Sequence, residues 1–261
     1  MGILNVTPDS FSEGGAFFNL HQAVDHALRM AEEGADMIDV GGESTRPGAM
    51  PVSLEEESQR VIPVIEKLSS RLKIPISIDT TKSEVARRAI DVGAAIVNDV
   101  SGFTKDPLMF PVVAWGTAGL VIMHAKGTPQ TMQRAPRYRN VIEEIYQFLG
   151  CRITQAMGHD IARKRIAIDP GIGFGKTATH NLTILHHLNR FLGLGLPVLV
   201  GPSRKSFIGK VLHLKPTERL EGTAAAAAIA IFQGAHIIRV HDVGPMKRVV
   251  QVAEAIRRGK V

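Results

Sequence analysis

The chain has 261 residues, 44% of them hydrophobic, and this length and composition suit one α/β barrel with a sizeable core. Its formal charge of +6 comes from scattered Lys and Arg, and only 5% of residues are aromatic, which favours an anionic small-molecule partner over nucleic acid. No apolar run reaches the roughly 18 residues of a membrane span, and the single cysteine, Cys151, excludes an internal disulfide, so we expect a cytoplasmic protein.

Short apolar runs recur along the chain, at 2–6, 36–40, 75–79, 94–99, 119–124, 165–169, 197–201 and 236–240. Amphipathic segments typical of helices lie between them, for example at 20–33, 54–72, 83–92, 138–157 and 245–258, and the small-residue run 222–235 predicts a helix packed closely on the sheet. Strands that are apolar throughout indicate a parallel sheet buried on both faces. Eight such units predict a single-domain (β/α)8 TIM barrel over residues 1–261, with an open doubly wound sheet as the alternative.

Polar residues stand where the apolar runs end, and in barrel enzymes such positions point into the active site. They are Asn5, residues 41–46, Asp79, Asn98, His124, Asp169, residues 203–206, Arg239 and His241. Any single Asp after a strand can simply cap a helix or form a turn. A whole set that shares one barrel mouth predicts a polar active site, because buried polar groups need partners.

The predicted site residues divide by chemistry. Asp79, Asn98 and Asp169 could hold a nitrogen heterocycle through its ring N–H and amino groups. Arg46, Arg239 and His241 could bind phosphate or carboxylate, and Lys205 and Ser206 open a helix whose backbone N–H groups attract anions. A zinc site of His124, His241 and Asp169 is a weaker alternative, since Asn5-Val6-Thr7 stands where a metal-binding His-x-His is usual.

The stretch DPGIGFGKT at 169–177 resembles a nucleotide-binding P-loop but fails the motif at one position. The first glycine of the motif should stand at 170, and Pro170 has no N–H to offer a phosphate. The strict P-loop motif is therefore not met. Asp169 is the residue of this loop that stands at the end of an apolar run, and Lys176, which first suggested a nucleotide, is the one we least expect to matter.

Eight segments, in this order, resemble the dihydropteroate synthase family, folate-pathway enzymes that are the target of sulfonamides. They are GILNVTPDSFSEGG (2–15), GGESTRPGA (41–49), ISIDT (76–80), VNDVSG (97–102), MHAKGTPQTMQ (123–133), DPGIGFGKT (169–177), SRKSFIG (203–209) and RVHDV (239–243). The resemblance implies a Mg²⁺-dependent transferase, commonly a homodimer, that condenses 6-hydroxymethyl-7,8-dihydropterin diphosphate with 4-aminobenzoate to 7,8-dihydropteroate and diphosphate.

The resemblance also implies a role for each site residue. Asp79, Asn98, Asp169 and Lys205 would hold the pterin, with Asp79, Asp169 and Lys205 as the catalytic groups. Asn5 would bind Mg²⁺ on the diphosphate, with Arg46, Arg239 and His241 near that group. Thr45 would lie against the substrates, Ser206 would bind the aminobenzoate carboxylate, and Pro47 and Phe174 would wall its pocket. The loops 7–19 and 42–53 would be mobile and close over the diphosphate.

One departure and two alternatives accompany this resemblance. Ala125 stands where the family usually has Met, which predicts a wider floor of the pterin pocket. A corrinoid-dependent pterin methyltransferase shares the barrel, but the loops PDSFSEGG and SRKSFIG argue against it. A non-catalytic pterin-binding paralogue is disfavoured because the residues expected at the diphosphate, such as Asn5 and Arg46, are present.

Overall fold

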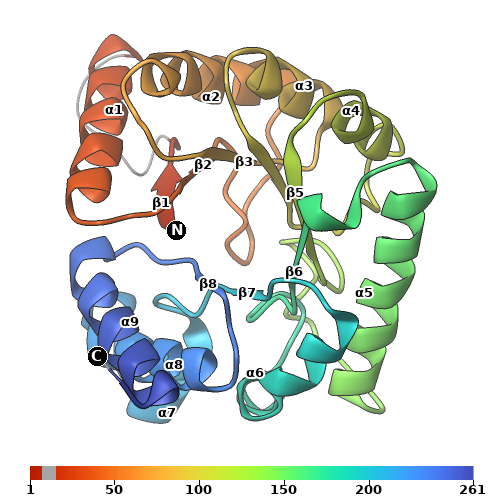
Figure 1. Ribbon diagram of the computed structural model, residues 1–261, viewed down its shortest axis with the longest axis vertical. Coiled ribbons are helices and arrows are strands. Elements are labelled where there is room, and N and C mark those ends of the chain that lie inside the picture. The colour runs from red at the N-terminus through yellow and green to blue at the C-terminus, as the bar shows by residue number, and fades with distance from the viewer. Residues whose placement is uncertain (8–15, 261) are drawn as a thin grey trace.

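The computed structural model describes residues 1–7 and 16–260 and shows a ring of parallel strands inside a ring of helices (Figure 1). The strands are β1 (Gly2–Asn5), β2 (Ile38–Gly41), β3 (Ile76–Asp79), β4 (Ile96–Asp99), β5 (Gly119–Met123), β6 (Ile166–Asp169), β7 (Leu199–Val200) and β8 (Ile237–Ile238). The helices are α1 (Ala16–Glu32), α2 (Leu54–Ser69), α3 (Ser83–Asp91), α4 (Met109–Trp115), α5 (Val141–Gly158), α6 (Ala178–His186), α7 (Ser206–Leu212), α8 (Leu220–Phe232) and α9 (Val243–Arg258). Each predicted apolar run overlaps one strand.

The strands close into a barrel. Strands β1 to β6 form one parallel sheet in chain order, and β7 pairs in parallel with β8. Single bridges join the two sheets at both sides, between Gly2 and Val240 and between Ile168 and Val198. This closure excludes the open doubly wound alternative, and the predicted (β/α)8 arrangement is the one observed.

Local sequence explains where several helices begin. Ser53 caps α2 by accepting a hydrogen bond from the backbone of Glu56, and Asn140 caps α5 in the same way. Thr177 and His180 form a reciprocal capping box at the start of α6. The small-residue run predicted as a helix is α8, whose buried face includes Ala226, Ala227 and Ala230.

Side-chain alternation along the strands creates two separate apolar regions. A large core between the strands and the helices includes Leu4, Ile38, Ile78 and Ile168. Residues of the opposite parity face the inside of the barrel, where Met1, Val121 and Leu199 form a small cluster of their own. Continuing this inward parity toward the carboxyl ends of the strands leads to polar residues, which places the candidate site.

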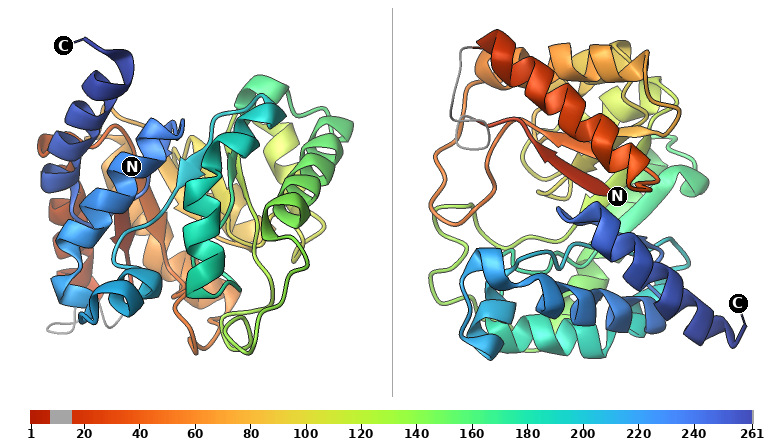
Figure 2. Two further views of the ribbon diagram at one scale, coloured as in Figure 1. Left: turned by 90° about the horizontal axis from the view of Figure 1, so that it is seen from below. Right: turned by 90° about the vertical axis from the view of Figure 1, so that its left-hand side faces the viewer.

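Two long loops extend from the carboxyl end of the barrel in Figure 2, 42–53 after β2 and 124–140 after β5. They meet where Gly48 N donates to the carbonyl of Pro129 at 2.9 Å. The expected mobile loop 7–19 lies mostly outside the described residues, and its movement, like that of 42–53, stays a prediction.

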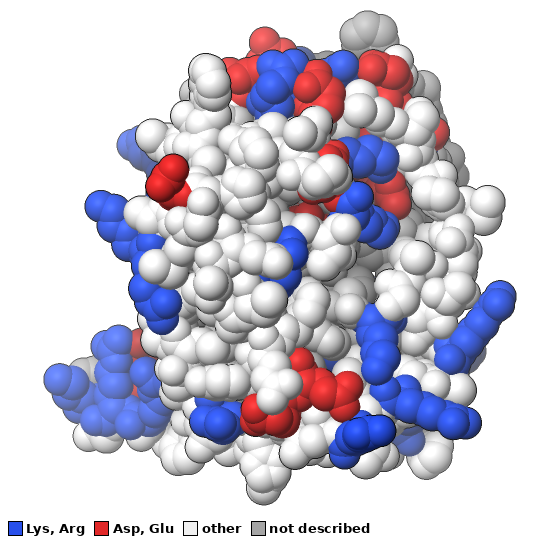
Figure 3. All heavy atoms as spheres, turned by 90° about the vertical axis from the view of Figure 1, so that its right-hand side faces the viewer, with Lys and Arg blue, Asp and Glu red and all other residues white. Residues whose placement is uncertain are grey.

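On the face shown in Figure 3, Lys and Arg stand in separate groups, with Asp and Glu among them. Among residues 1–7 and 16–260, no helix is both long and apolar enough to cross a membrane.

Candidate active site

A charged network crosses the inside of the barrel beyond the apolar cluster. Arg239, directly after β8, donates from Nε to Asp39 Oδ2 at 2.6 Å and from a terminal nitrogen to Asp79 Oδ2 at 2.7 Å. Asn98 Nδ2 donates to the same Asp39 oxygen at 3.0 Å. Arg239 was expected beside Arg46 and His241, but its guanidinium contacts these two carboxylates because its strand position points it across the barrel.

Asp39 is a site residue that the sequence patterns did not reveal. It lies inside the apolar run 36–40 rather than at its end, and in the structure it is fully buried. Its Oδ1 has no hydrogen-bond partner among the described residues, and leaving such an oxygen buried without one costs about 1–3 kcal/mol. A carboxylate within an apolar strand, at the inward parity, was the available signal. Its unpaired oxygen makes Asp39 an acceptor for a ligand N–H.

Burial shifts the ionisation of these groups toward their neutral forms. It raises the pKa of Asp79 to about 7, against the opposing effect of Arg239, and raises the pKa of Asp169 to about 6. Burial also lowers the pKa of Lys205 to about 8, with Arg239 as the next cause. Groups poised this close to neutrality, gathered at a barrel mouth, are typical of an active site.

The loop after β6 owes its shape to close backbone packing. Gly171 and Gly175 have φ values of +72° and +66°. A Cβ on Gly171 would lie 1.9 Å from the carbonyl oxygen of His124, and one on Gly175 would lie 2.2 Å from that of Lys126. Asp169 Oδ1 accepts from Gly171 N at 2.7 Å and fixes the first turn. These glycines serve the packing of two loops, which supports the interpretation that this is not a P-loop.

The loop after β6 meets the start of α7 near three predicted site residues, Phe174, Lys205 and Ser206. Lys205 Nζ stands 4.2 Å from the centroid of the Phe174 ring, a favourable position for a cation over an aromatic face. Lys205 is the N-cap residue of α7, and Ser206 is its first residue and is exposed. Pro47, in the loop after β2, is also exposed.

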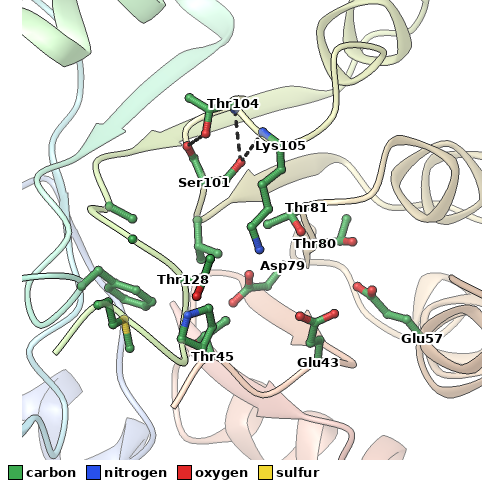
Figure 4. Close-up of a pocket in the computed structure, with 16 residues that line it drawn as sticks. Glu43, Thr45, Glu57, Asp79, Thr80, Thr81, Ser101, Thr104, Lys105 and Thr128 are labelled. Carbon is green, nitrogen blue, oxygen red and sulfur yellow. Dashed lines mark hydrogen bonds between the residues drawn. The ribbon is translucent and has the colours of Figure 1, made fainter. Parts of the chain in front are cut away.

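A cavity of about 340 Å³ opens between the loops after β2, β3, β4 and β5 (Figure 4). Thr45, Asp79 and Phe174, all predicted site residues, are in its wall. In Figure 4 the carboxylates of Glu43 and Asp79 point into this cavity. Ala125 is also in the wall, so its short side chain leaves space open at this place.

A second hollow, of about 630 Å³, is lined by α1, by β1 and by the residues just before α9. Asn5, Arg46 and His241 line it together, as do Arg29 and Arg204. His241 Nδ1 is 2.9 Å from Ser203 Oγ, and burial lowers the pKa of His241 to about 4, with Arg239 as the next cause. Arg204 is paired with Asp242, and Arg29 and Arg46 then stand against one further aspartate, Asp25, in this wall. This is the more cationic of the two recesses and suits an anion.

The structure does not build a resident metal site from the described residues. No group of three or more His, Cys, Asp or Glu side chains there stands in a metal-binding arrangement. His124 Nδ1 faces Lys176 Nζ at 3.0 Å, while His241 faces Ser203. The zinc alternative therefore has no support in this part of the chain. The Asn5 amide oxygen, beside a cationic hollow, instead suits a hard cation that is bound mainly by a phosphate ligand.

The structure thus groups most predicted site residues but not all. Asp79, Asn98 and Arg239 belong to the network with Asp39, while Asn5, Arg46 and His241 share the cationic hollow. Ser206 lines neither recess. Lys176, expected to matter least, is one of the largest fully buried side chains of the described residues.

The chain is similar to known proteins over nearly its whole length. The family model described as pterin binding enzyme matches residues 1–241. A dihydropteroate synthase of Synechocystis is 51% identical over 259 residues, 99% of this chain and 90% of that protein. The enzyme of that name from Escherichia coli K12 is 48% identical over 260 residues, covering 100% and 92% of the two chains.

Solved structures show the same similarity. A Yersinia pestis dihydropteroate synthase in complex with a sulfonamide drug superposes with a TM-score of 0.93 at 43% identity, over 99% of this chain and 94% of that chain. The Xanthomonas albilineans enzyme with 4-aminobenzoic acid gives 0.93 at 46% identity, over 98% and 92%. The same enzyme with 7,8-dihydropteroate gives 0.89 at 43% identity, over 98% and 92%.

Proposed function

The chain belongs to the pterin-binding enzyme family, and from this premise we infer that it is a dihydropteroate synthase. It condenses 6-hydroxymethyl-7,8-dihydropterin diphosphate with 4-aminobenzoate and releases diphosphate. The observation that carries this conclusion is the buried carboxylate network at the barrel mouth, next to a cationic hollow, in a chain about half identical to synthases over nearly its whole length.

The pterin ring would bind to the buried network. Asp79 and Asp169 offer carboxylate oxygens to the ring N–H and amino groups, and Asn98 offers a further acceptor or donor. Asp39, with one oxygen unpaired among the described residues, adds a further acceptor inside the barrel, beside Asn98. A bound ring that donates to these carboxylates favours their charged forms, so binding the pterin shifts the raised pKa values of Asp79 and Asp169 downward.

The diphosphate would occupy the hollow lined by Asn5, Arg46 and His241. Arg46 there would neutralise the charge that grows on the leaving oxygen. Mg²⁺ bound to the diphosphate would be held by the Asn5 oxygen and would act as a Lewis acid that stabilises the leaving group. Thr45 lines the cavity beside Asp79, while the next residue of the same loop, Arg46, lines this hollow.

4-Aminobenzoate would bind at the outer side, where Phe174 and Lys205 stand together. Its ring would pack between Phe174 and Pro47, and its carboxylate would accept from the hydroxyl of Ser206. This arrangement leaves the amino group directed inward, toward the methylene carbon of the pterin.

The reaction then needs little proton transfer from the protein. The C–O bond to the diphosphate breaks with both electrons going to that oxygen, and the cation left on the pterin methylene is stabilised by the charges of Asp79 and Asp169. The lone pair of the neutral arylamine forms the new C–N bond. The extra proton on the amine nitrogen passes to solvent or to the released diphosphate, which restores neutrality.

We further propose that the enzyme is a homodimer. Large apolar side chains on α8 and α9 are exposed, with Phe232 62% and Ile256 65% accessible. The two helices pack against each other, so Ile229, Phe232, Val252 and Ile256 can form one continuous contact surface. The cytoplasm remains the compartment expected from the single cysteine.

One assay tests the function directly. Purified protein is given the pterin diphosphate, Mg²⁺ and labelled 4-aminobenzoate, and labelled dihydropteroate is measured by chromatography. Product that depends on both substrates and disappears with a chelator of Mg²⁺ is the expected result. Folded protein that forms no product, or that transfers methyl groups from methyltetrahydrofolate instead, would contradict the proposal.

A further inference from the structure

Lys176 is a lysine buried inside the protein, only 2% accessible, although most lysines lie at the surface. Its Nζ has three acceptors in reach: the carbonyl of Phe174 at 2.9 Å, the ring Nδ1 of His124 at 3.0 Å and the carbonyl of His124 at 3.1 Å. In its protonated form the amine has three N–H bonds and no lone pair, so this set of three acceptors can satisfy it completely.

The ionisable groups around Lys176 fit a structural role for this lysine inside the protein. Burial lowers the pKa of Lys176 to about 7, opposed by Asp169 and reinforced by Lys205 and Lys126. Burial, followed by Lys176 itself, lowers the pKa of His124 to about 3, so the imidazole is neutral, and its Nδ1 can accept in the tautomer whose ring proton is on Nε2. Burying an amine among these neighbours costs desolvation free energy.

The three contacts connect two different loops. His124 follows β5, whereas Phe174 belongs to the loop after β6, so Lys176 joins the two walls of the cavity in which Phe174 stands. Other hydrogen bonds hold the glycines of this loop. Gly173 N donates to Asn181 Oδ1 at 2.7 Å, and Tyr138 OH donates to the Gly175 carbonyl at 2.9 Å. Lys176 is the tie that holds the carbonyl of Phe174 itself.

We propose that Lys176 is a positioning residue for 4-aminobenzoate, because its ammonium group fixes the Phe174 peptide against the end of β5 and so holds the Phe174 ring in place beside Lys205. The inference rests on the synthase activity proposed above. The pterin side of the site depends less on this contact, since Asp39, Asp79 and Asn98 are held by the strand ladder and by Arg239. Asp169, which lies near Lys176, has its backbone held separately by the β5–β6 ladder.

Kinetics of Lys176→Met test the proposal, since Met keeps the length and loses the three donors. We expect the KM for 4-aminobenzoate to rise about tenfold or more, while the KM for the pterin diphosphate changes less than about threefold, in line with the loss of a positioning contact. Lys164→Met, at an exposed lysine, is the matched control and should leave both constants unchanged. Equal rises in both KM values, or none, would overturn the proposal.

A double-mutant cycle separates positioning from general destabilisation. If Lys176 acts through Phe174, adding Lys176→Met to Phe174→Ala should raise the KM for 4-aminobenzoate by less than about twofold further. Full additivity of the two effects would overturn the proposal. If Lys176→Met does not fold, Tyr138→Phe can be used, because it removes the neighbouring hydrogen bond to the Gly175 carbonyl. It should raise the KM for 4-aminobenzoate without raising the KM for the pterin diphosphate. An unchanged KM for 4-aminobenzoate in this variant would count against the mechanism.

Hydrogen–deuterium exchange gives a readout that needs no activity. In Lys176→Met, amides of 171–176 and 124–127 should exchange faster than in the unmodified protein, while the β1–β4 strands stay protected. Unchanged exchange in both loops would show that Lys176 does not hold them. If the unmodified protein forms no dihydropteroate, the synthase function fails, but faster exchange in these loops would still support the contact.

Discussion

Replacing Asp169 with Asn should make the protein more stable and less active. The side chain is buried, and burial raises the pKa of its carboxyl from the ordinary 3.8 to about 6. The amide of the variant would keep an oxygen that can accept from Gly171 N, the hydrogen bond now 2.7 Å long, and the substitution would remove only the buried charge.

The magnitude and its pH dependence follow from linkage. Because the folded-state pKa is raised, the folded chain holds a proton that the unfolded chain has lost between pH 3.8 and about 6, so stability falls as pH rises through this window. A pKa shift of about two units corresponds to a loss of about 3 kcal/mol in the free energy of unfolding. This loss is fully developed above pH 6 and about half developed at pH 5. At pH 8 the free energy of unfolding of the variant should therefore exceed that of the unmodified protein by up to about 3 kcal/mol, which corresponds to a rise of roughly 6–12 °C in Tm.

Urea unfolding of the ligand-free protein at pH 5 and pH 8 measures this difference. Asp160→Asn is a suitable control because Asp160 is exposed and has φ of +62°, a conformation that Asn adopts readily. The variant at position 169 should also lose affinity for the pterin by about tenfold or more, as expected for removing a charged hydrogen-bond partner. An equal gain at both pH values, or a loss of stability at pH 8, would refute the reasoning.

Three further outcomes are expected. Asp79→Asn should lower kcat by about 100-fold or more, whereas Asp160→Asn should leave it unchanged in the labelled-substrate assay; comparable losses would contradict the assigned role. Ser206→Ala should raise the KM for 4-aminobenzoate about tenfold with little change for the pterin diphosphate, and an unchanged KM would refute that placement. Phe232→Arg should shift the mass measured by light scattering from dimer to monomer, and an unmodified chain that is already monomeric would contradict the proposed interface.

Much of the fold could be predicted from local patterns. Short, mostly apolar runs, each followed by a polar residue and a helical segment, indicate strands buried on both faces, and eight in sequence close most simply into a barrel. Asp79, Asn98 and Asp169 could be placed at the mouth for the same reason, because the carboxyl ends of parallel strands all meet at one end. The resemblance of eight segments to a known family then supplied the substrates.

Long-range contacts could not be predicted in this way. Arg239 and Asp39 are 200 positions apart, and nothing in either segment says that the guanidinium crosses the barrel to pair with that carboxylate. Asp39 was hidden because its inward direction depends on strand parity within a closed barrel, and Arg239 differed from its expected neighbours for the same reason.

Local sequence therefore determined the strands, the helix caps and which polar residues reach the barrel mouth, since these follow from periodicity over a few neighbouring residues. Tertiary structure alone decided the partners. Lys176 shows the difference most clearly: in the sequence it is the lysine of a failed P-loop, and in the structure it is buried between two loops. Its environment depends on the carbonyl of His124, 52 residues earlier, which only the folded chain brings within 3.1 Å of its ammonium group.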